Sequence, residues 1–303
     1  MSDPDTPATP RRASSRRGTR DLVRDPIAST LARMTGPVIG GIVTMMLFNL
    51  VDAWFIAQLG TPELAAVTMT FPVTFGVISI AIGLSIGTTA VVGRRLGRGE
   101  LETVKARTTD SSLLGLLLGL VMLVLGLASI EPLFGLLGAD DTLMPHIRDY
   151  MQVWYFGAPF VLLPRVLASV LRAEGNTLVP SLVMAAAGVL NALLDPLLIF
   201  GIGDWQGMGV AGAALATVLS WLALTLGLLA LPLLRARLDF RHLSVTRLVT
   251  SWREVGAIGL PAALTSVMTP IATALVTRIV SQHGHAAVAA YGIGSRIESL
   301  ALI

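Results

Sequence analysis

From Thr35 onward, long apolar segments alternate with short polar breaks, and this alternation limits the fold more than any other feature of the chain. Each segment approaches or exceeds the ~20 residues that a helix needs to cross the hydrocarbon core of a bilayer. A membrane β-barrel would instead need alternating segments of about ten residues. We therefore predict an all-α polytopic membrane protein, with helices at 35–59, 65–92, 110–134, 147–171, 179–201, 209–232 and 255–281 and the start of another near 286.

The composition agrees with this class. Hydrophobic residues make up 53% of the chain and charged residues only 14%, whereas a soluble domain carries about a quarter charged residues. The net charge of +3 does not indicate nucleic-acid binding, because the arginines lie in the breaks between apolar segments. The chain contains no cysteine, which excludes disulfides and thiolate metal sites.

Arginine-rich and arginine-poor breaks alternate along the chain. The rich breaks are the tail 1–25, residues 93–107, the turn at Arg172 and residues 235–253, and the poor ones are 60–64, 138–148, 201–207 and 283–285. Positively charged loops stay on the cytoplasmic side of a membrane. We therefore predict a multi-pass protein of the cytoplasmic (inner) membrane with a cytoplasmic N-terminus.

The breaks also divide the chain into four predicted parts. We expect a disordered, basic cytoplasmic tail at 1–25, a six-helix transmembrane lobe at 26–234, a cytoplasmic linker at 235–254 and the start of a second lobe at 255–303. The tail has no apolar run that would serve as a signal peptide. For the linker, an amphipathic helix on the membrane surface and an ordinary loop remain open.

An internal repeat supports two lobes. A shift of 224 residues without gaps aligns Pro37 with Pro261, Gln58 with Gln282 and Gly60 with Gly284. This repeat predicts a pseudo-symmetric second lobe, of which the chain holds the first one to two helices. Because the sequence stops inside an unfinished apolar segment, we expect it to be a truncated part of a longer protein.

Two of the apolar segments contain acids. Asp52 lies in the outer half of the first segment, where a charged side chain is costly unless it is used. Asn191 and Asp195 are four residues apart and share one face of the fifth helix. Pro196 cannot donate to the carbonyl four residues earlier, so it frees an acceptor beside the acid. This set suits a proton or a small hard cation, and a structural kink capped by its own polar residues is the alternative.

The acids are predicted to lie at one level of the membrane. Asp52 and Asp195 sit on helices that run in the same direction, and both lie about 10 Å below the outer surface. Tyr150 and Thr217 lie in the first turns of two helices that run back from that surface. Two carboxylates close together in a low dielectric do not both ionise easily, so they share a proton or a cation. An organic cation would compete for the same place.

Several motifs appear in a family-specific order. They are NLVDAWFIAQLG at 49–60, LRAEGNTLVPSL at 171–182, NALLDPLLIFG at 191–201, GVAGAALATVLS at 209–220 and AAYGIGSRIESL at 289–300. Together they resemble the multidrug and toxic compound extrusion family of transporters. The resemblance implies two pseudo-symmetric lobes of six helices, and the export of organic, often cationic, compounds in exchange for H⁺ or Na⁺.

The resemblance also implies which residues act. The ion-coupling and substrate-binding residues would be Asp52, Tyr150, Asn191, Asp195 and Thr217, and all of these except Tyr150 would bind the ion if it is Na⁺. One branch of the family has a glutamate where this chain has Thr269–Pro270, so the branch that uses first-lobe acids fits better. We expect a monomer in a lipid bilayer that handles small organic substrates, with no cofactor besides the coupling ion.

No catalytic motif is present. The chain has no phosphate-binding loop, no HExxH and no Ser-His-Asp context, so we predict that it is not an enzyme and takes its energy from an ion gradient.

The leading prediction is a secondary active antiporter. A flippase for lipid-linked oligosaccharide precursors would need a basic cavity, whereas the predicted cavity is acidic; a noncatalytic scaffold or channel half is the third class. Pairing, snorkelling, or a gating or substrate role stays open for Arg165, Arg278 and Arg296.

Overall fold

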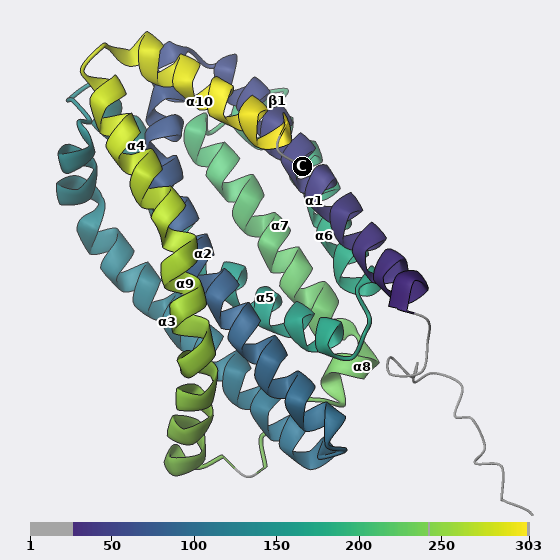
Figure 1. Ribbon diagram of the computed structural model, residues 1–303. Coiled ribbons are helices and arrows are strands. Elements are labelled where there is room, and N and C mark those ends of the chain that lie inside the picture. Colours follow the sequence, from purple (N-terminus) through teal and green to yellow (C-terminus); the bar gives the residue numbers. More distant parts are fainter. Residues whose placement is uncertain (1–26, 242, 302–303) are drawn as a thin grey trace, which may run out of the picture.

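The computed structural model describes residues 27–241 and 243–301 (Figure 1). The tail predicted to be disordered lies outside these residues. The described chain forms the helices α1 (Ile27–Ala57), α2 (Thr61–Gly97), α3 (Leu101–Leu137), α4 (Leu143–Phe156), α5 (Ala158–Ala173), α6 (Leu178–Phe200), α7 (Val210–Ala230), α8 (Pro232–Arg235), α9 (Val245–Ser281) and α10 (His285–Ala301), and a short antiparallel hairpin of β1 (Gly201–Ile202) and β2 (Trp205–Gln206).

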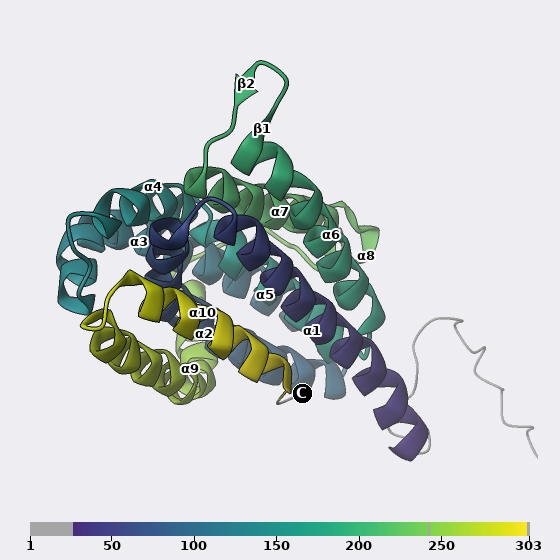
Figure 2. The same ribbon diagram turned by 90° about the horizontal axis from the view of Figure 1, so that it is seen from above.

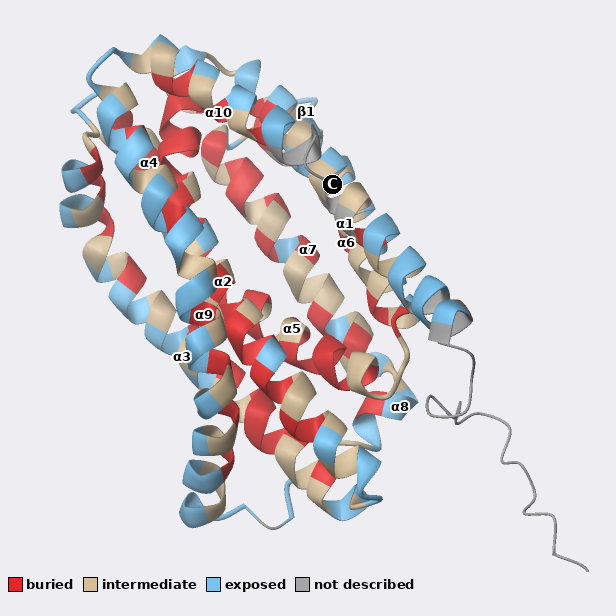
Figure 3. Ribbon diagram, viewed as in Figure 1, coloured by how far each residue is buried: buried red, intermediate tan, exposed pale blue. Residues whose placement is uncertain are grey.

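The helix lengths confirm the all-α polytopic class. Within the described residues, six helices are long and apolar enough to cross a membrane, or seven if the bent pair of α4 and α5 counts as one span. Large apolar side chains such as Leu117, Leu193 and Leu275 are exposed on the outside of the bundle. Figure 3 shows the buried residues concentrated on α2 and α5 in the middle of the molecule. An apolar exterior of this kind is what a lipid environment requires.

The predicted helix 147–171 is not continuous. It begins earlier, at Leu143, and splits at Gly157 into α4 and α5, which are bent by 43°. Pro159 explains the break, since a proline has no N–H to donate to the carbonyl of Tyr155 and its ring crowds that carbonyl. The bend turns α5 toward the centre of the bundle.

Four unbroken helices are longer than predicted, and one of them is α1, which begins at Ile27 instead of residue 35. α2 extends to Gly97, α3 begins at Leu101 and α9 begins at Val245, because hydropathy marks where a helix leaves the hydrocarbon and not where it ends. At the start of α9, the Ser244 hydroxyl accepts the N–H of Arg247 at 3.2 Å, which caps the helix. Residues 245–254 of the predicted linker are therefore the first turns of α9 rather than a separate surface helix.

A buried polar network joins α3 to α9 at the arginine-rich end. Asp110 is fully buried, and Arg247 donates to its carboxylate at 2.7 Å. The indole N–H of Trp252 donates to the Asp110 carbonyl at 2.8 Å. Glu254, two residues after Trp252, accepts from Arg107 at 3.2 Å. Because each buried charge is paired, this network fixes the start of α9 against the first lobe.

Small residues let α2 and α9 pack closely. A Cβ added at Gly83 would collide with the carbonyl of Gly259 and the methyl of Ala263, and one added at Gly87 would collide with the carbonyl of Val255. Glycine and alanine allow helix backbones to approach each other in this way. The contact holds the first helix of the second lobe along α2 of the first lobe.

The local geometry agrees with the internal repeat. Gly60 joins α1 to α2 and Gly284 joins α9 to α10, and both glycines have positive φ angles, 151° and 91°. α9 packs on α2, and α10 packs on both α1 and α2. Figure 2 shows α10 lying across the bundle between α9 and α1.

The opposite end of the bundle holds an exposed ion pair. His285 at the start of α10 lies 2.7 Å from the carboxylate of Asp140, which precedes α4. This hydrogen bond holds the pKa of the Asp140 carboxyl below its ordinary value. Arg278, whose role the sequence left open, is exposed and lies against Gly138.

The packing of α2 on α9 predicts that two glycine substitutions on α2 change the stability by different amounts. Gly83→Ala should lower the stability by about 1–3 kcal/mol because the added methyl separates two backbones. Gly76→Ala on the same helix is the matched control, since its methyl would meet no atom within 4 Å. Thermal unfolding of the purified protein in detergent measures both. Equal melting temperatures for the two variants would contradict the close contact.

Candidate functional site

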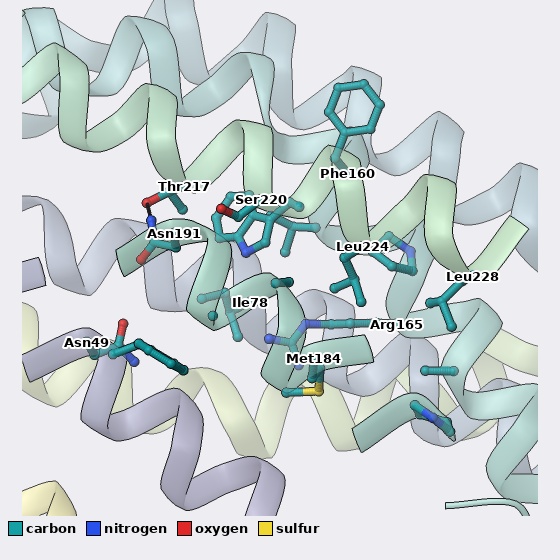
Figure 4. Close-up of a pocket in the computed structure, with 18 of the residues that line it drawn as sticks. Asn49, Ile78, Phe160, Arg165, Met184, Asn191, Thr217, Ser220, Leu224 and Leu228 are labelled. Atoms are coloured by element: carbon teal, nitrogen blue, oxygen red, sulfur yellow. Dashed lines mark hydrogen bonds between the residues drawn. The ribbon is translucent and has the colours of Figure 1, made fainter. Parts of the chain in front are cut away.

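A cavity of about 220 Å³ lies between α1, α2, α5, α6 and α7. Figure 4 shows its walls, with Asn191 and Thr217 near one end and Leu228 near the other. Apolar and aromatic side chains make most of the wall, and the polar groups gather at two places. We call these places the acidic end, made by Asp52, Asn191, Asp195 and Thr217, and the basic end, made by Arg165 and Arg172.

Asn191 is the centre of the acidic end. Its amide nitrogen lies 3.4 Å from a carboxylate oxygen of Asp195, one turn along α6, and 3.4 Å from the hydroxyl of Thr217 on α7. The Thr217 hydroxyl donates to the carbonyl of Ala213 at 3.1 Å, which leaves its oxygen free to accept from the amide. Asn191 and Thr217 line the cavity, whereas Asp195 is fully buried beside it. Pro196 follows Asp195 without ending α6.

Asp52 approaches the same place from α1. It lines the cavity and interacts electrostatically with Asp195 on the neighbouring helix. Its Oδ1 and the Oδ2 of Asp195 are buried, and neither has a hydrogen-bond donor among the residues that the structure describes. Buried carboxylate oxygens without donors are costly. The acidic end can therefore accept a proton or bind a cation.

Tyr150 lies behind this pair. It is almost completely buried in α4, does not line the cavity, and interacts electrostatically with both Asp52 and Asp195. The structure thus brings the five predicted residues to one place. Hydrogen bonds join Asn191 to two of them, and electrostatic interactions join the others.

Arg296 was not predicted as a neighbour of Asp52. It comes from α10, is 8% exposed, and donates to the carbonyl of Asn49 at 3.0 Å. Its guanidinium lies 4.6 Å from the centre of the Phe71 ring and interacts electrostatically with Asp52. A cation from the second lobe therefore faces the acid of the first. The sequence signal was a lone arginine inside an apolar segment, which by itself does not reveal which helix it contacts.

The cavity is acidic only in part, whereas the sequence predicted an acidic cavity. Arg165 and Arg172, both on α5, line the same cavity, and in Figure 4 Arg165 extends into it near Ile78 and Met184. Arg172 donates to the hydroxyl of Ser85 at 2.8 Å. From the sequence, pairing, snorkelling, or a gating or substrate role stayed open for Arg165. The break at Gly157, which redirects α5, is the reason it points inward instead.

Long apolar helices around a central cavity with buried acids are the architecture of a secondary transporter. The family described as MatE matches residues 37–197. The chain belongs to this family, which confirms the resemblance seen in the sequence.

Known proteins agree with this assignment. The chain is 42% identical over 93% of its length to a protein of Shewanella oneidensis named FAD transporter, and covers 63% of it. It is 27% identical over 86% of its length to the multidrug export protein MepA of Staphylococcus saprophyticus, and covers 57% of that protein. The structure of the Vibrio cholerae MATE transporter VcmN in the bent form is similar with a TM-score of 0.75 and 34% identity, covering 90% of this chain and 61% of that one. The chain thus spans less than two thirds of these curated relatives.

Because the chain contains no cysteine, single cysteines can test the cavity directly. Met184→Cys should react with a water-soluble maleimide, since Met184 lines the cavity. Leu182→Cys, on the same helix but with 59% of its side chain exposed on the outside, is the matched control and should react at least about tenfold more slowly in lipid. Labelling of the reconstituted protein gives both rates. Faster labelling at the control position would contradict the cavity.

Proposed function

We propose that the chain forms the first lobe and the first helices of the second lobe of a transporter that exports organic compounds across the cell membrane in exchange for H⁺ or Na⁺. One observation carries the proposal. Two buried carboxylate oxygens, on Asp52 and Asp195, lie beside a membrane cavity without hydrogen-bond donors among the described residues. Such a place favours a proton or a cation. We also propose a monomeric protein with a cytoplasmic N-terminus.

The acidic end is suited to bind the coupling ion. If the ion is Na⁺, the carboxylate oxygens of Asp52 and Asp195, the Asn191 carbonyl and the Thr217 hydroxyl are the hard oxygen ligands that it prefers. The Asn191 amide then turns over on ion binding, because its nitrogen faces Asp195 and Thr217 in this structure. If the ion is H⁺, the two carboxylates share it. In both cases the ion reduces the repulsion between two acids from different helices.

Arg296 couples ion binding at Asp52 to the position of the second lobe. Asp52 attracts this arginine, which holds α10 against α1 through the Asn49 carbonyl. A proton or Na⁺ on Asp52 weakens that attraction, because the acid is then neutralised. Ion binding and the position of α10 are therefore linked, which is the differential interaction that an exchange mechanism needs.

The cargo is an organic compound that fits an amphipathic cavity. The names of similar proteins include both an FAD transporter and multidrug export proteins. A flippase for lipid-linked precursors is the second candidate, favoured by the basic end of the cavity. The two differ in the cargo, since a flippase moves a lipid-linked pyrophosphate and an exporter moves a water-soluble compound.

Removing either acid should abolish coupled transport. Asp52→Asn and Asp195→Asn each lower ion-driven export by at least about tenfold, because the neutral amide cannot take up H⁺ and binds Na⁺ poorly. Asp204→Asn, in the exposed turn between β1 and β2, is the control and leaves transport unchanged. Proteoliposomes loaded with ethidium or with FAD and given a H⁺ or Na⁺ gradient provide the measurement.

The same assay separates the alternatives. Export driven by one gradient identifies the coupling ion. Full gradient-driven export by both acid variants would contradict the proposal. Movement of a lipid-linked oligosaccharide, with no export of either soluble probe, would favour the flippase.

A further inference from the structure

The basic end of the cavity holds two arginines on one face of α5. Arg165 and Arg172 are seven residues apart, which is two helical turns, so both side chains point to the same side. The guanidinium groups interact electrostatically with each other. Two positive charges that share a cavity repel each other, and a negative guest relieves this repulsion.

Neither arginine has a carboxylate partner among the residues that the structure describes. Across the described residues, Arg165 has no hydrogen-bonding or ionic partner for its side chain, and the only one for Arg172 is the Ser85 hydroxyl. Glu174, the nearest acid along the chain, is already occupied by Arg237 at 2.5 Å. Charged side chains inside a membrane are otherwise paired. The basic end therefore carries positive charge that the described residues do not neutralise.

The depth of Arg165 argues against simple snorkelling. Arg172 is in the last turn of α5, whereas Arg165 lies about 10 Å deeper along the helix. Figure 4 places Arg165 beside Ile78 and Met184, between the Asn191 and Leu228 ends of the cavity. Its side chain points into the cavity rather than toward the nearer membrane surface.

The wall beside these arginines is aromatic. Phe75 on α2, Phe160 on α5 and Trp221 on α7 line the same cavity. The Phe75 side chain is 41% exposed, so its ring is accessible. Aromatic walls bind planar rings by stacking. The cavity thus combines a cationic end with surfaces for a flat apolar group.

We propose that Arg165 and Arg172 form an anion-binding subsite for the phosphate of a water-soluble, phosphate-bearing aromatic compound. This inference rests on the proposed transport function and names its cargo class. The guanidinium groups bind the phosphate oxygens, and the aromatic wall binds the ring. The acidic end keeps the coupling cation, so ion and cargo occupy different ends of one cavity. Arginine suits phosphate because its planar donors bind two oxygens at once.

Binding of two matched flavins to the purified protein in nanodiscs tests the subsite. FMN and riboflavin share the isoalloxazine ring and differ in the phosphate. The wild type should bind FMN at least about tenfold more tightly than riboflavin, the gain of one charge-assisted phosphate contact. Arg165→Gln and Arg172→Gln should each remove most of this preference and leave riboflavin binding unchanged. Flavin fluorescence gives the dissociation constants.

Matched variants control for loss of folding. Arg148→Gln removes an arginine that pairs with Glu131 outside the cavity, and its FMN preference should equal that of the wild type. Arg165→Lys keeps the charge but not the bidentate geometry, so it should keep part of the preference. Equal binding of the two flavins by the wild type, or an undiminished preference in both Gln variants, would overturn the subsite.

Two further measurements distinguish failure of the phosphate subsite from failure of the transport proposal and from lipid binding. Binding is measured at equilibrium without a gradient, so loss of transport with an intact FMN preference would refute only the coupling. Nanodiscs rich in phosphatidylglycerol should not compete with FMN. Displacement of FMN by this anionic lipid, through the same arginines, would overturn the soluble cargo and assign the subsite to a lipid phosphate.

Discussion

A carboxylate buried within a bilayer needs positive charge or hydrogen-bond donors, and this requirement governs the centre of the protein. Asp52 and Asp195 come from neighbouring helices, and each has a buried oxygen without a donor in the described chain. The amide of Asn191 reaches a single oxygen of Asp195 at 3.4 Å. Part of the negative charge of this pair is therefore not compensated by the described residues. A proton or Na⁺ is the simplest ligand that would compensate it.

The packing around the two acids determines which helices respond when a proton or Na⁺ binds. Close contact at Gly83 and Gly259 holds α9 along α2, and the Asp110 network fixes the start of α9. α10 then crosses to α1, where Arg296 meets Asp52. α10 packs on α1 and α2, and Arg296 is its side chain that interacts with Asp52. Neutralising the acid therefore acts on α10 rather than on α9. A change in the charge of Asp52 therefore changes the contact between α10 and α1.

Much of this arrangement could be predicted from the sequence. Apolar segment lengths gave the class and the spans, and the four-residue spacing of Asn191 and Asp195 placed them on one face. The sequence could not predict the positions of residues that contact helices distant in the chain. Arg165 points into the cavity because Pro159 breaks the helix and redirects α5, and the apolar pattern continues through that break. Arg296 reaches α1 only because the second lobe folds back across the first, which no local pattern records.

The central claim is that cargo and a cation exchange through this lobe, and ion flow driven by cargo tests it most directly. The protein is reconstituted in liposomes that contain a pH- or Na⁺-sensitive dye and start without any ion gradient. Cargo added on the outside should drive H⁺ or Na⁺ out of the liposomes as the cargo enters, because each turnover exchanges one for the other. Cargo that enters while the internal H⁺ and Na⁺ concentrations stay constant would contradict the account.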